Sequence, residues 1–381
     1  QWGARYLIAH PHLLDYLIDS HMERALIEHP EDYWREVKAN LDMRLDDVMA
    51  ERDGSEQAMD ILRVTHHTET FITLLADLGI GVERALSVEK VSDHLSALAD
   101  LLIDITLATV WKSLPNYHRD SPQFAVIAYG KLGGKELGYA SDLDIIFLYD
   151  DDNPEAPAIY AKLAQRFITW MTSHTSAGIL FDVDIALRPD GASGLLVSSF
   201  TAFEKYQRQS AWVWEHQALT RARFCAGDPE IGARFESLRT ALLKMPRKKD
   251  ELTQEVLAMR ERMRDAHPNE SNLFDLKHDS GGMIDIEFIV QYLVLLHAGQ
   301  HPELTADIGN IALLKLLGQL HLIDASLAER VADAYRYFRK LQHQIRLKGA
   351  DKARVELIPS VESLREAVHQ LWLQVIQQTT K

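Results

Sequence analysis

The sequence predicts an α+β fold: a mostly helical chain with a small mixed sheet between an N-terminal and a C-terminal helical bundle. Apolar residues recur at helical spacing before residue 115 and again in the last part of the chain. Between these parts, short apolar runs rich in β-forming residues alternate with turns. A chain of 381 residues is also too long for one ordinary core, which stops growing at about 250 to 300 residues. We therefore expect three domains, at 1–115, 116–225 and 226–381.

The N-terminal domain is predicted to consist of amphipathic helices. Ser92 is a good N-cap for a helix over 91–114. Similar patterns cover 30–51 and 55–79, with breaks at Pro30 and at the Asp53-Gly54 pair. The helix over 91–114 carries one wide apolar stripe, made of Leu95, Leu98, Leu101, Leu102, Ile105, Leu107 and Val110.

Two adjacent histidines, His66 and His67, precede Glu69 in the second of these helices. Neighbouring residues on a helix diverge, so the three side chains do not converge on one ion. We interpret them as part of a solvated face.

The middle of the chain has the pattern of a mixed or antiparallel sheet. FAVIAY (124–129) and DIIFLYD (144–150) are short apolar runs typical of strands, and 159–174 has helical spacing. The runs 179–187 and 194–199 are predicted to form a further pair around the turn RPDGASG. Phe274–Lys277 is a candidate for one more strand of the same sheet.

Composition excludes several classes of function. The formal charge of −15 disfavours nucleic acid as a macromolecular substrate, because such binding normally needs a basic surface. The single cysteine, Cys225, excludes an internal disulfide and a cysteine-rich zinc module. No run approaches the roughly 18 apolar residues of a bilayer span, and the N-terminus lacks the order of a signal peptide. We expect a cytoplasmic protein without membrane contact, and, since residue 1 is not methionine, a piece of a longer chain.

The chemistry is concentrated in AYGKLGGKELGYASDLDIIFL, residues 128–148. Residues two apart in a strand point the same way, so Asp142 and Asp144 present two carboxylates to one face, where they can share divalent cations. The glycines before them, Gly130, Gly133 and Gly134, allow backbone to approach anionic oxygens, and Lys131 or Lys135 adds positive charge.

Other phosphate-binding patterns do not fit this stretch. A P-loop requires G-x-x-x-x-G-K-[ST], but Lys135 stands at the second glycine, and no Rossmann G-x-G-x-x-G occurs. A third carboxylate is available from FDVDIALRP, where Asp182 and Asp184 are again two apart. A glycine loop, D-x-D and a distant carboxylate are the layout of two-metal nucleotidyl transfer, and carboxylates without a His or Cys cage suit Mg²⁺.

Four segments together resemble the C-terminal half of bacterial glutamine synthetase adenylyltransferase, a bifunctional adenylyltransferase and adenylyl-removing enzyme. They are the 128–148 stretch, GILFDVDIALRPDGASGLLV (178–197), WVWEHQALTRAR (212–223) and FDLKHDSGGMIDIEF (274–288). D-x-D alone marks only the broader polymerase-β-like nucleotidyltransferase superfamily, whose mixed sheet the resemblance implies for the central domain.

The resemblance also implies roles for individual residues. Asp142, Asp144 and Asp184 fall on the catalytic, metal-binding positions for two Mg²⁺ ions, whereas Asp182 falls on a variable one. Ala186 stands where the related pattern has arginine, which leaves Arg188 as the basic contact to phosphate. The residues implied in binding ATP are Gly130, Lys131, Gly133, Gly134, Ser141, Arg188 and Lys277.

The implied reaction transfers AMP from ATP to a tyrosine hydroxyl of glutamine synthetase and releases pyrophosphate. PII signalling protein and glutamine are implied regulators of the full-length enzyme. Three alternatives remain open: the AMP-removing half, a related uridylyltransferase, and a regulatory module that binds nucleotide without turnover. Retention of all three aspartates disfavours the last, and the negative charge disfavours a nucleic-acid polymerase.

Two further segments carry polar groups. The tryptophans of the predicted helix 212–223 are interpreted as core, with Glu215 or an arginine reaching the nucleotide as the alternative. Near Gly281 and Gly282 the backbone can approach a ligand; capping by Asp279 or Ser280 is the alternative there. This second glycine pair is flanked by Lys277, Asp285 and Glu287.

Overall fold

The computed structural model describes residues 6–8, 10–11, 13–14, 26–50, 54–80, 82, 84–115, 117–350 and 352–377. The chain forms two compact units. The first consists of Gln1–Phe203 with Phe224–Ala233, and the second of Glu204–Arg223 with Arg234–Lys381. The N-terminal helices and the sheet therefore fall in one unit, while the three-domain division stays a prediction.

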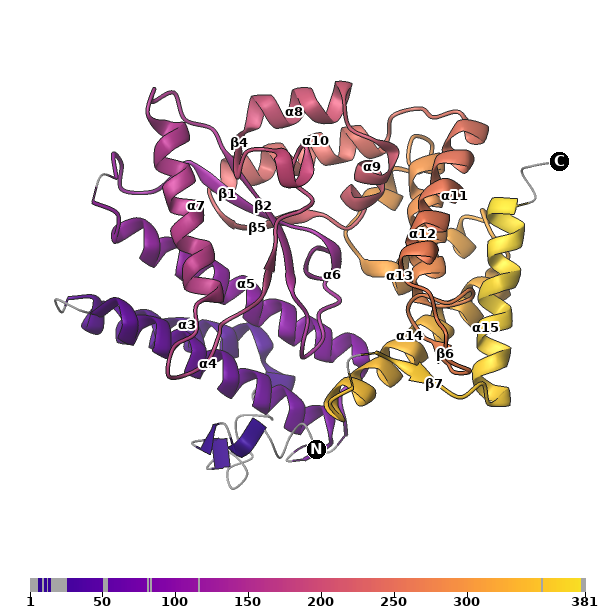
Figure 1. The fold of residues 1–381 in the computed structure, drawn as a ribbon, viewed down its shortest axis with the longest axis horizontal. Coiled ribbons are helices and arrows are strands. Elements are labelled where there is room, and N and C mark those ends of the chain that lie inside the picture. Colours follow the sequence, from indigo (N-terminus) through magenta and orange to yellow (C-terminus); the bar gives the residue numbers. More distant parts are fainter. Residues whose placement is uncertain are drawn as a thin grey trace. The chain divides into compact units, whose positions relative to one another are not determined.

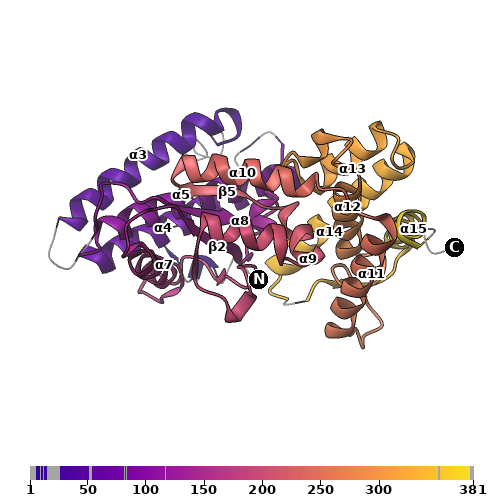
Figure 2. The ribbon, with the colours of Figure 1, turned by 90° about the horizontal axis from the view of Figure 1, so that it is seen from above.

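Three long helices open the first unit and run side by side in both views (Figures 1 and 2). They are α3 (Pro30–Met49), α4 (Gly54–Asp77) and α5 (Val88–Lys112), as the apolar patterns predict. The break predicted at Asp53 lies outside the described residues.

Helix α5 starts three residues before the predicted start of its pattern. Its N-cap is Ser87, whose side chain accepts a hydrogen bond from the Lys90 N–H at 3.3 Å. Ser92 lies inside the helix and donates to the Leu137 carbonyl at 2.6 Å, so the N-cap prediction for Ser92 was wrong. By length and composition α5 could cross a membrane, but 67% of that stretch is buried within the structure, as in a core helix.

The first unit contains a mixed sheet with the order β3-β2-β1-β5 (Figure 1). Strands β1 (Phe124–Ala128) and β2 (Leu143–Tyr149) confirm two predicted runs and pair antiparallel, with Phe124 opposite Tyr149. Helix α7 (Ala156–Thr172) follows β2, and the four-residue helix α6 (Gly130–Gly133) follows β1.

The predicted pairing of the runs 179–187 and 194–199 was wrong. Strands β3 (Val183–Asp184) and β4 (Val197–Ser199) each pair parallel with β2, at Leu143–Asp144 and at Phe147–Tyr149. Because β3 and β4 both run parallel to β2, they are not antiparallel partners of each other. The loop between them therefore leaves the sheet after β3 and returns to it at β4, and it is not a hairpin turn.

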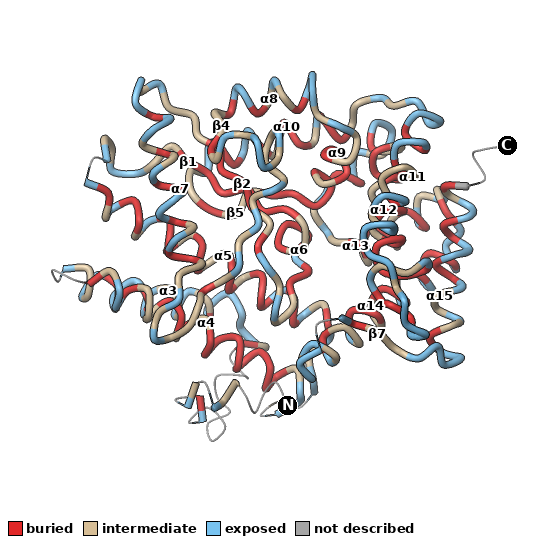
Figure 3. Tube along the Cα trace, in the orientation of Figure 1, coloured by how far each residue is buried: buried red, intermediate tan, exposed pale blue. Residues whose placement is uncertain are grey.

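Successive side chains of β2 point to opposite faces of the sheet, and one of these faces is packed in the core. Phe124, Val126 and Ala128 of β1 and Leu143, Ile145 and Phe147 of β2 belong to one buried cluster with residues of α5 and α7. The central strands are accordingly buried (Figure 3). Even-numbered residues of β2 point to the opposite face, and Asp144 is one of them.

The last strand of the sheet, β5 (Arg223–Gly227), was missed by the sequence analysis. The helix predicted over 212–223 is shorter in the structure, where α9 covers only Val213–Leu219. Trp212 lies before α9 and is 64% exposed, so its assignment to the core was also wrong. Gly227 has φ +99 and an added Cβ would overlap the Phe124 carbonyl, so glycine is needed where β5 meets β1.

The second unit is helical, as its sequence predicts. Helices α8 (Phe200–Gln209) and α10 (Pro229–Leu243) begin in the first unit and end in the second. The remaining helices are α11 (Lys249–Ala266), α12 (Met283–His297), α13 (Gly309–Gln319), α14 (Ala325–Leu347) and α15 (Pro359–Trp372).

A strand does form at the start of the predicted run Phe274–Lys277, but not in the sheet of the first unit. Strand β6 (Phe274–Asp275) pairs antiparallel with β7 (Arg354–Val355), and the two make a separate sheet. Arg354 also approaches Asp275 across this pair, with Nε 3.3 Å from Oδ2. The placement in the central sheet was wrong because the true partner lies about 80 residues later, beyond the reach of a local pattern.

Candidate active site

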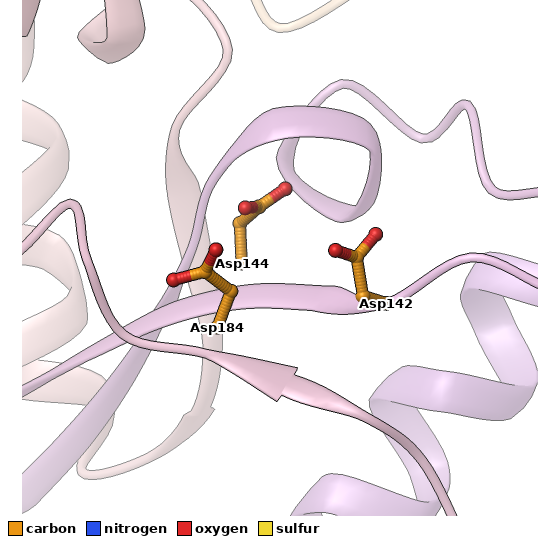
Figure 4. A group of neighbouring side chains, drawn as sticks. All are labelled: Asp142, Asp144 and Asp184. Atoms are coloured by element: carbon orange, nitrogen blue, oxygen red, sulfur yellow. The ribbon is translucent and has the colours of Figure 1, made fainter.

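Three aspartates converge where the start of β2 pairs with β3. Asp144 and Asp184 are direct neighbours in the parallel register of these strands, and Asp142 precedes β2 on the same face as Asp144. One carboxylate oxygen from each residue lies within 4.8 Å of the others. Figure 4 shows the three carboxylates on one side of the two strands. Asp142 and Asp184 are exposed, and Asp144 is half-buried.

The backbone around β3 fixes the third carboxylate. The Leu143 N–H donates to the Asp182 carbonyl at 2.9 Å, which continues the pairing of β2 with β3. The Asp184 carboxylate accepts the Ala186 N–H at 2.7 Å, which orients its side chain. Asp182 is not part of the converging group.

Gly130 packs against this group from the end of β1. Its φ is +55, in the left-handed region that favours glycine. An added Cβ would lie 2.9 Å from Cγ of Asp144 and closer still to its Oδ2. Only glycine, which has no Cβ, allows the backbone at position 130 to lie this close to the Asp144 carboxylate.

The other glycines of the loop form the short helix α6 and its end. The N–H groups of Gly133 and Gly134 donate to the carbonyls of Tyr129 and Gly130, at 2.8 and 3.1 Å. These two N–H groups are therefore already hydrogen-bonded to the backbone of the same short segment. Lys131 lies in α6, half-buried, and Lys135 lies beyond it, exposed and with φ +52.

The donor set suits a hard divalent cation. It offers carboxylate oxygens from three residues without histidine or cysteine, and Mg²⁺ prefers such ligands together with phosphate and water. In the part of the chain that the structure describes, this is the one group of three or more potential ligand residues that converge in this way.

The remaining predicted residues occupy different places. The Ser141 hydroxyl accepts the Gly138 N–H at 3.0 Å and closes the turn before Asp142. The Arg188 guanidinium donates to three carbonyls of its own loop, those of Ile185, Ala192 and Gly194, and so holds the β3–β4 excursion. Lys277 is exposed and belongs to the second unit.

Comparison with known proteins identifies the family. The family model for glutamate-ammonia ligase adenylyltransferase matches residues 1–238, which include all three aspartates. The chain belongs to the glutamate-ammonia ligase adenylyltransferase family. Residues 250–372 match a second model, GlnD PII-uridylyltransferase.

Curated relatives of this adenylyltransferase family agree. The chain is 56% identical to a bifunctional glutamine synthetase adenylyltransferase/adenylyl-removing enzyme of Ralstonia nicotianae, over 98% of this chain and 38% of the relative. Relatives with the same description occur in Aromatoleum aromaticum, at 53% identity over 98% of this chain and 38% of the relative, and in Bordetella bronchiseptica, at 52% over 100% and 39%. The chain thus spans about two fifths of the length of these relatives.

Sequence reasoning missed a buried polar layer on α4, in the same unit as the three aspartates. Arg63 is fully buried and donates four hydrogen bonds, to the carbonyls of Met59, Trp170, Ser173 and Gly178 at 2.6 to 2.8 Å. Three of these carbonyls belong to the segment that leads into β3. The helix is thereby fixed to the chain that carries Asp184.

His66, His67 and Glu69 are not on a solvated face, so that prediction was wrong. Glu69 and His67 are 4% and 8% exposed. Burial raises the pKa of Glu69 to about 7, against the opposing effect of a 2.5 Å hydrogen bond from the Tyr33 hydroxyl. Burial, with the charges of His67, His10 and Arg63, lowers the pKa of His66 to about 3. No local pattern in α4 distinguishes these residues from surface ones.

Proposed function

We propose that this chain catalyses transfer of AMP from ATP to a tyrosine hydroxyl of glutamine synthetase, with release of pyrophosphate. The observation that supports this most is the convergence of Asp142, Asp144 and Asp184 in a chain of the adenylyltransferase family. The phenol oxygen attacks the α-phosphorus, the bond to the bridging oxygen breaks, and pyrophosphate leaves with that electron pair. The phenol proton is released to solvent, which reaches the exposed Asp142 and Asp184.

Each part of the site has a task in this reaction. The three aspartates would hold two Mg²⁺ ions, which when bound neutralise phosphate charge and favour the ionised form of the acceptor hydroxyl. Gly130 has no side chain, which lets the Asp144 carboxylate pack directly against the backbone of the loop. Lys131 would add charge for the triphosphate, and Ser141 and Arg188 shape the loops on either side. Lys277 belongs to the second unit, and its contact to the nucleotide stays a prediction from the sequence.

The chain's own contribution is mainly positioning. Asp144 and Asp184 are paired residues of neighbouring strands. The two carboxylates are therefore held at a fixed spacing in the protein without bound ligand. Groups held in place in advance need little reorganisation as charge develops on the phosphorus, and this is a large part of catalysis in phosphoryl transfer.

The wider setting is also proposed. The names of the relatives include both adenylyl transfer and adenylyl removal, and we assign this chain to the transferring half. The match of residues 250–372 to the PII-uridylyltransferase model supports PII as a regulator of the full-length enzyme, and we propose glutamine as a second regulator. We place the enzyme in the cytoplasm.

The test uses unmodified glutamine synthetase, Mg²⁺ and the 381-residue chain with α-labelled ATP or α-labelled UTP. We expect label on glutamine synthetase from ATP. Asp184→Asn should reduce labelling about a thousandfold, because a metal ligand is lost. Asp182→Asn is the matched control, two residues away and outside the converging group, and should label like the wild type.

Two results would contradict the proposal. Labelling from UTP alone would identify a uridylyltransferase. Removal of the AMP group from adenylylated glutamine synthetase by inorganic phosphate, with formation of ADP and without labelling of the unmodified form, would identify the removing half.

A further inference from the structure

A pocket of about 360 Å³ lies within the second unit. Its walls come from the end of α11, from the segment 267–280 and from α15 with the residues just before it. Liquid water takes about 30 Å³ per molecule, so the pocket has room for a ligand larger than a single small ion. The lining combines two arginines, two histidines and two exposed leucines: Arg264, Arg365, His267, His278, Leu273 and Leu357.

The segment that forms one wall is held by its own side chains. The Asp275 carboxylate accepts the N–H groups of Lys277 and His278, both at 3.0 Å. The Asp285 carboxylate accepts the Gly281 N–H at 2.7 Å. These backbone donors are therefore already paired within the protein, so a ligand in the pocket meets side chains that a fixed backbone presents.

The two histidines of the wall stack on each other. The centroids of the His267 and His278 rings are 4.1 Å apart, and the rings are 14° from parallel. Nδ1 of His267 donates to the Met263 carbonyl at 3.0 Å, and Nδ1 of His278 is enclosed by the protein. Each ring can therefore form a hydrogen bond with a ligand only through Nε2, and neither Nε2 has a hydrogen-bond partner among the described residues.

The two arginines remain available as cations. Arg264 approaches the Asp265 carboxylate only at 4.0 Å from Nε. Arg365 donates from Nε to the Ser280 carbonyl at 3.0 Å, and its Nη1 lies 3.5 Å from the Glu362 carboxylate. Solvent-accessible ion pairs of this kind contribute at most about 1 kcal/mol, so both guanidinium groups can turn to a more strongly charged ligand.

One carboxylate, that of Asp279, also lines the pocket. Its Oδ2 accepts the side-chain amide of Asn269 at 2.7 Å and the Asp275 N–H at 2.8 Å. Two donors thus already share its charge, and two arginines face this single acid in the lining. The pocket therefore favours an anion, although the chain as a whole has a formal charge of −15.

We propose that this pocket binds a phosphomonoester, with its phosphate at the two arginines and the two histidine Nε2 atoms and its apolar part against Leu273 and Leu357. A phosphate offers three oxygens to donors on several sides, whereas a carboxylate offers two. Because Nδ1 of His267 is a donor, Nε2 of the neutral ring is an acceptor. A phosphomonoester, with a second pKa of about 6, can share its proton with that nitrogen, whereas a carboxylate is fully ionised at pH 7 and has no proton to share.

The experiment measures binding of phenyl phosphate to the 381-residue chain without divalent cations, so that the three aspartates of the first unit repel the probe. Arg264→Gln removes an exposed charge of the lining and should weaken binding about tenfold. Arg262→Gln is the matched control, because Arg262 lies on the same helix, is exposed and does not line the pocket. It should bind phenyl phosphate like the wild type.

Three further probes separate the classes of ligand. Benzoate carries a carboxylate on the same ring, phenol carries no anionic group at pH 7, and inorganic phosphate carries no ring. Each should bind more weakly than phenyl phosphate. Benzoate that binds as tightly as phenyl phosphate would contradict the assignment to a phosphate, and inorganic phosphate that binds as tightly would contradict the apolar contact.

A second measurement reports on the histidines directly. The ring proton signals of His267 and His278, assigned with His267→Gln and His278→Gln, should shift when phenyl phosphate is added to the wild type or to Arg262→Gln. At the same probe concentration they should shift much less in Arg264→Gln. Unchanged ring signals in the wild type, equal affinity of wild type and Arg264→Gln, or an equal loss of affinity in Arg262→Gln would each overturn the proposal.

Discussion

Replacing Gly130 by alanine should damage the active site far more than the stability of the fold. An alanine Cβ would lie 2.9 Å from Cγ of Asp144, whereas carbon atoms in contact are normally about 3.5 to 4.0 Å apart. The carboxylate has to move by about 1 Å. Misplacement of a catalytic group by this amount costs on the order of a hundredfold in rate.

A second glycine with the same φ, Gly191, separates the effect of an alanine on stability from its effect on the active site. A left-handed conformation costs a residue with Cβ roughly 1 to 2 kcal/mol. Gly191 has the same φ of +55, but the nearest atom to its added Cβ is the Ala186 carbonyl oxygen at 3.7 Å, which is an ordinary contact. Gly130→Ala and Gly191→Ala should both lose about 1 to 2 kcal/mol, and Gly130→Ala somewhat more.

The assay is transfer of label from α-labelled ATP to glutamine synthetase, with urea unfolding measured alongside. We expect Gly130→Ala to lose about two orders of magnitude in rate and Gly191→Ala to stay within a few-fold of wild type. Similar rates for the two variants would refute the reasoning, because backbone strain alone would then explain both.

Three further predictions follow from single side chains. Asp144→Asn should lose roughly 4 kcal/mol of transition-state stabilisation, about a thousandfold in labelling rate; wild-type labelling at saturating Mg²⁺ would contradict its role. Arg63→Met leaves buried carbonyls unpaired and should lower the free energy of unfolding by about 3 kcal/mol or more, and a urea midpoint like that of wild type would show that these hydrogen bonds contribute little. The pKa of Glu69 is about 7 in the folded chain and 4.5 in the unfolded chain. As pH rises, Glu69 therefore loses its proton at a lower pH in the unfolded chain than in the folded chain. The stability that Glu69 contributes is full below about pH 4.5 and falls by about 3 kcal/mol as pH rises to about 7. The difference in unfolding free energy between wild type and Glu69→Gln should follow that slope, and a difference independent of pH would exclude it.

The parts of the fold that follow from local pattern were predicted well. Strands β1 and β2 have apolar residues in runs, and the segment around Asp142 and Asp144 has the two-residue alternation that places carboxylates on one face. The structure also brings Asp184 to the same place, although it lies some forty residues away. Local spacing alone left Asp182 equally eligible, and the preference for Asp184 came from resemblance to a family.

The parts that depend on distant partners were not predictable in this way. Strand β6 consists of two residues, and nothing near it reveals that its partner is Arg354–Val355. The polar residues of α4 resemble a surface, because the carbonyls that cover Arg63 come from Trp170, Ser173 and Gly178. A hydrogen bond across more than a hundred residues leaves no periodic signal in either segment.

The interleaving of the two units limits how this chain can be divided. Phe224–Ala233 returns to the first unit after Glu204–Arg223 has entered the second, and it supplies most of β5, the neighbour of β1. A ribosome therefore releases β1 long before the strand that covers its open edge, and an open edge is a site for aggregation. Expression of a shorter catalytic fragment should continue past residue 233, because a cut at 203 leaves the sheet without β5.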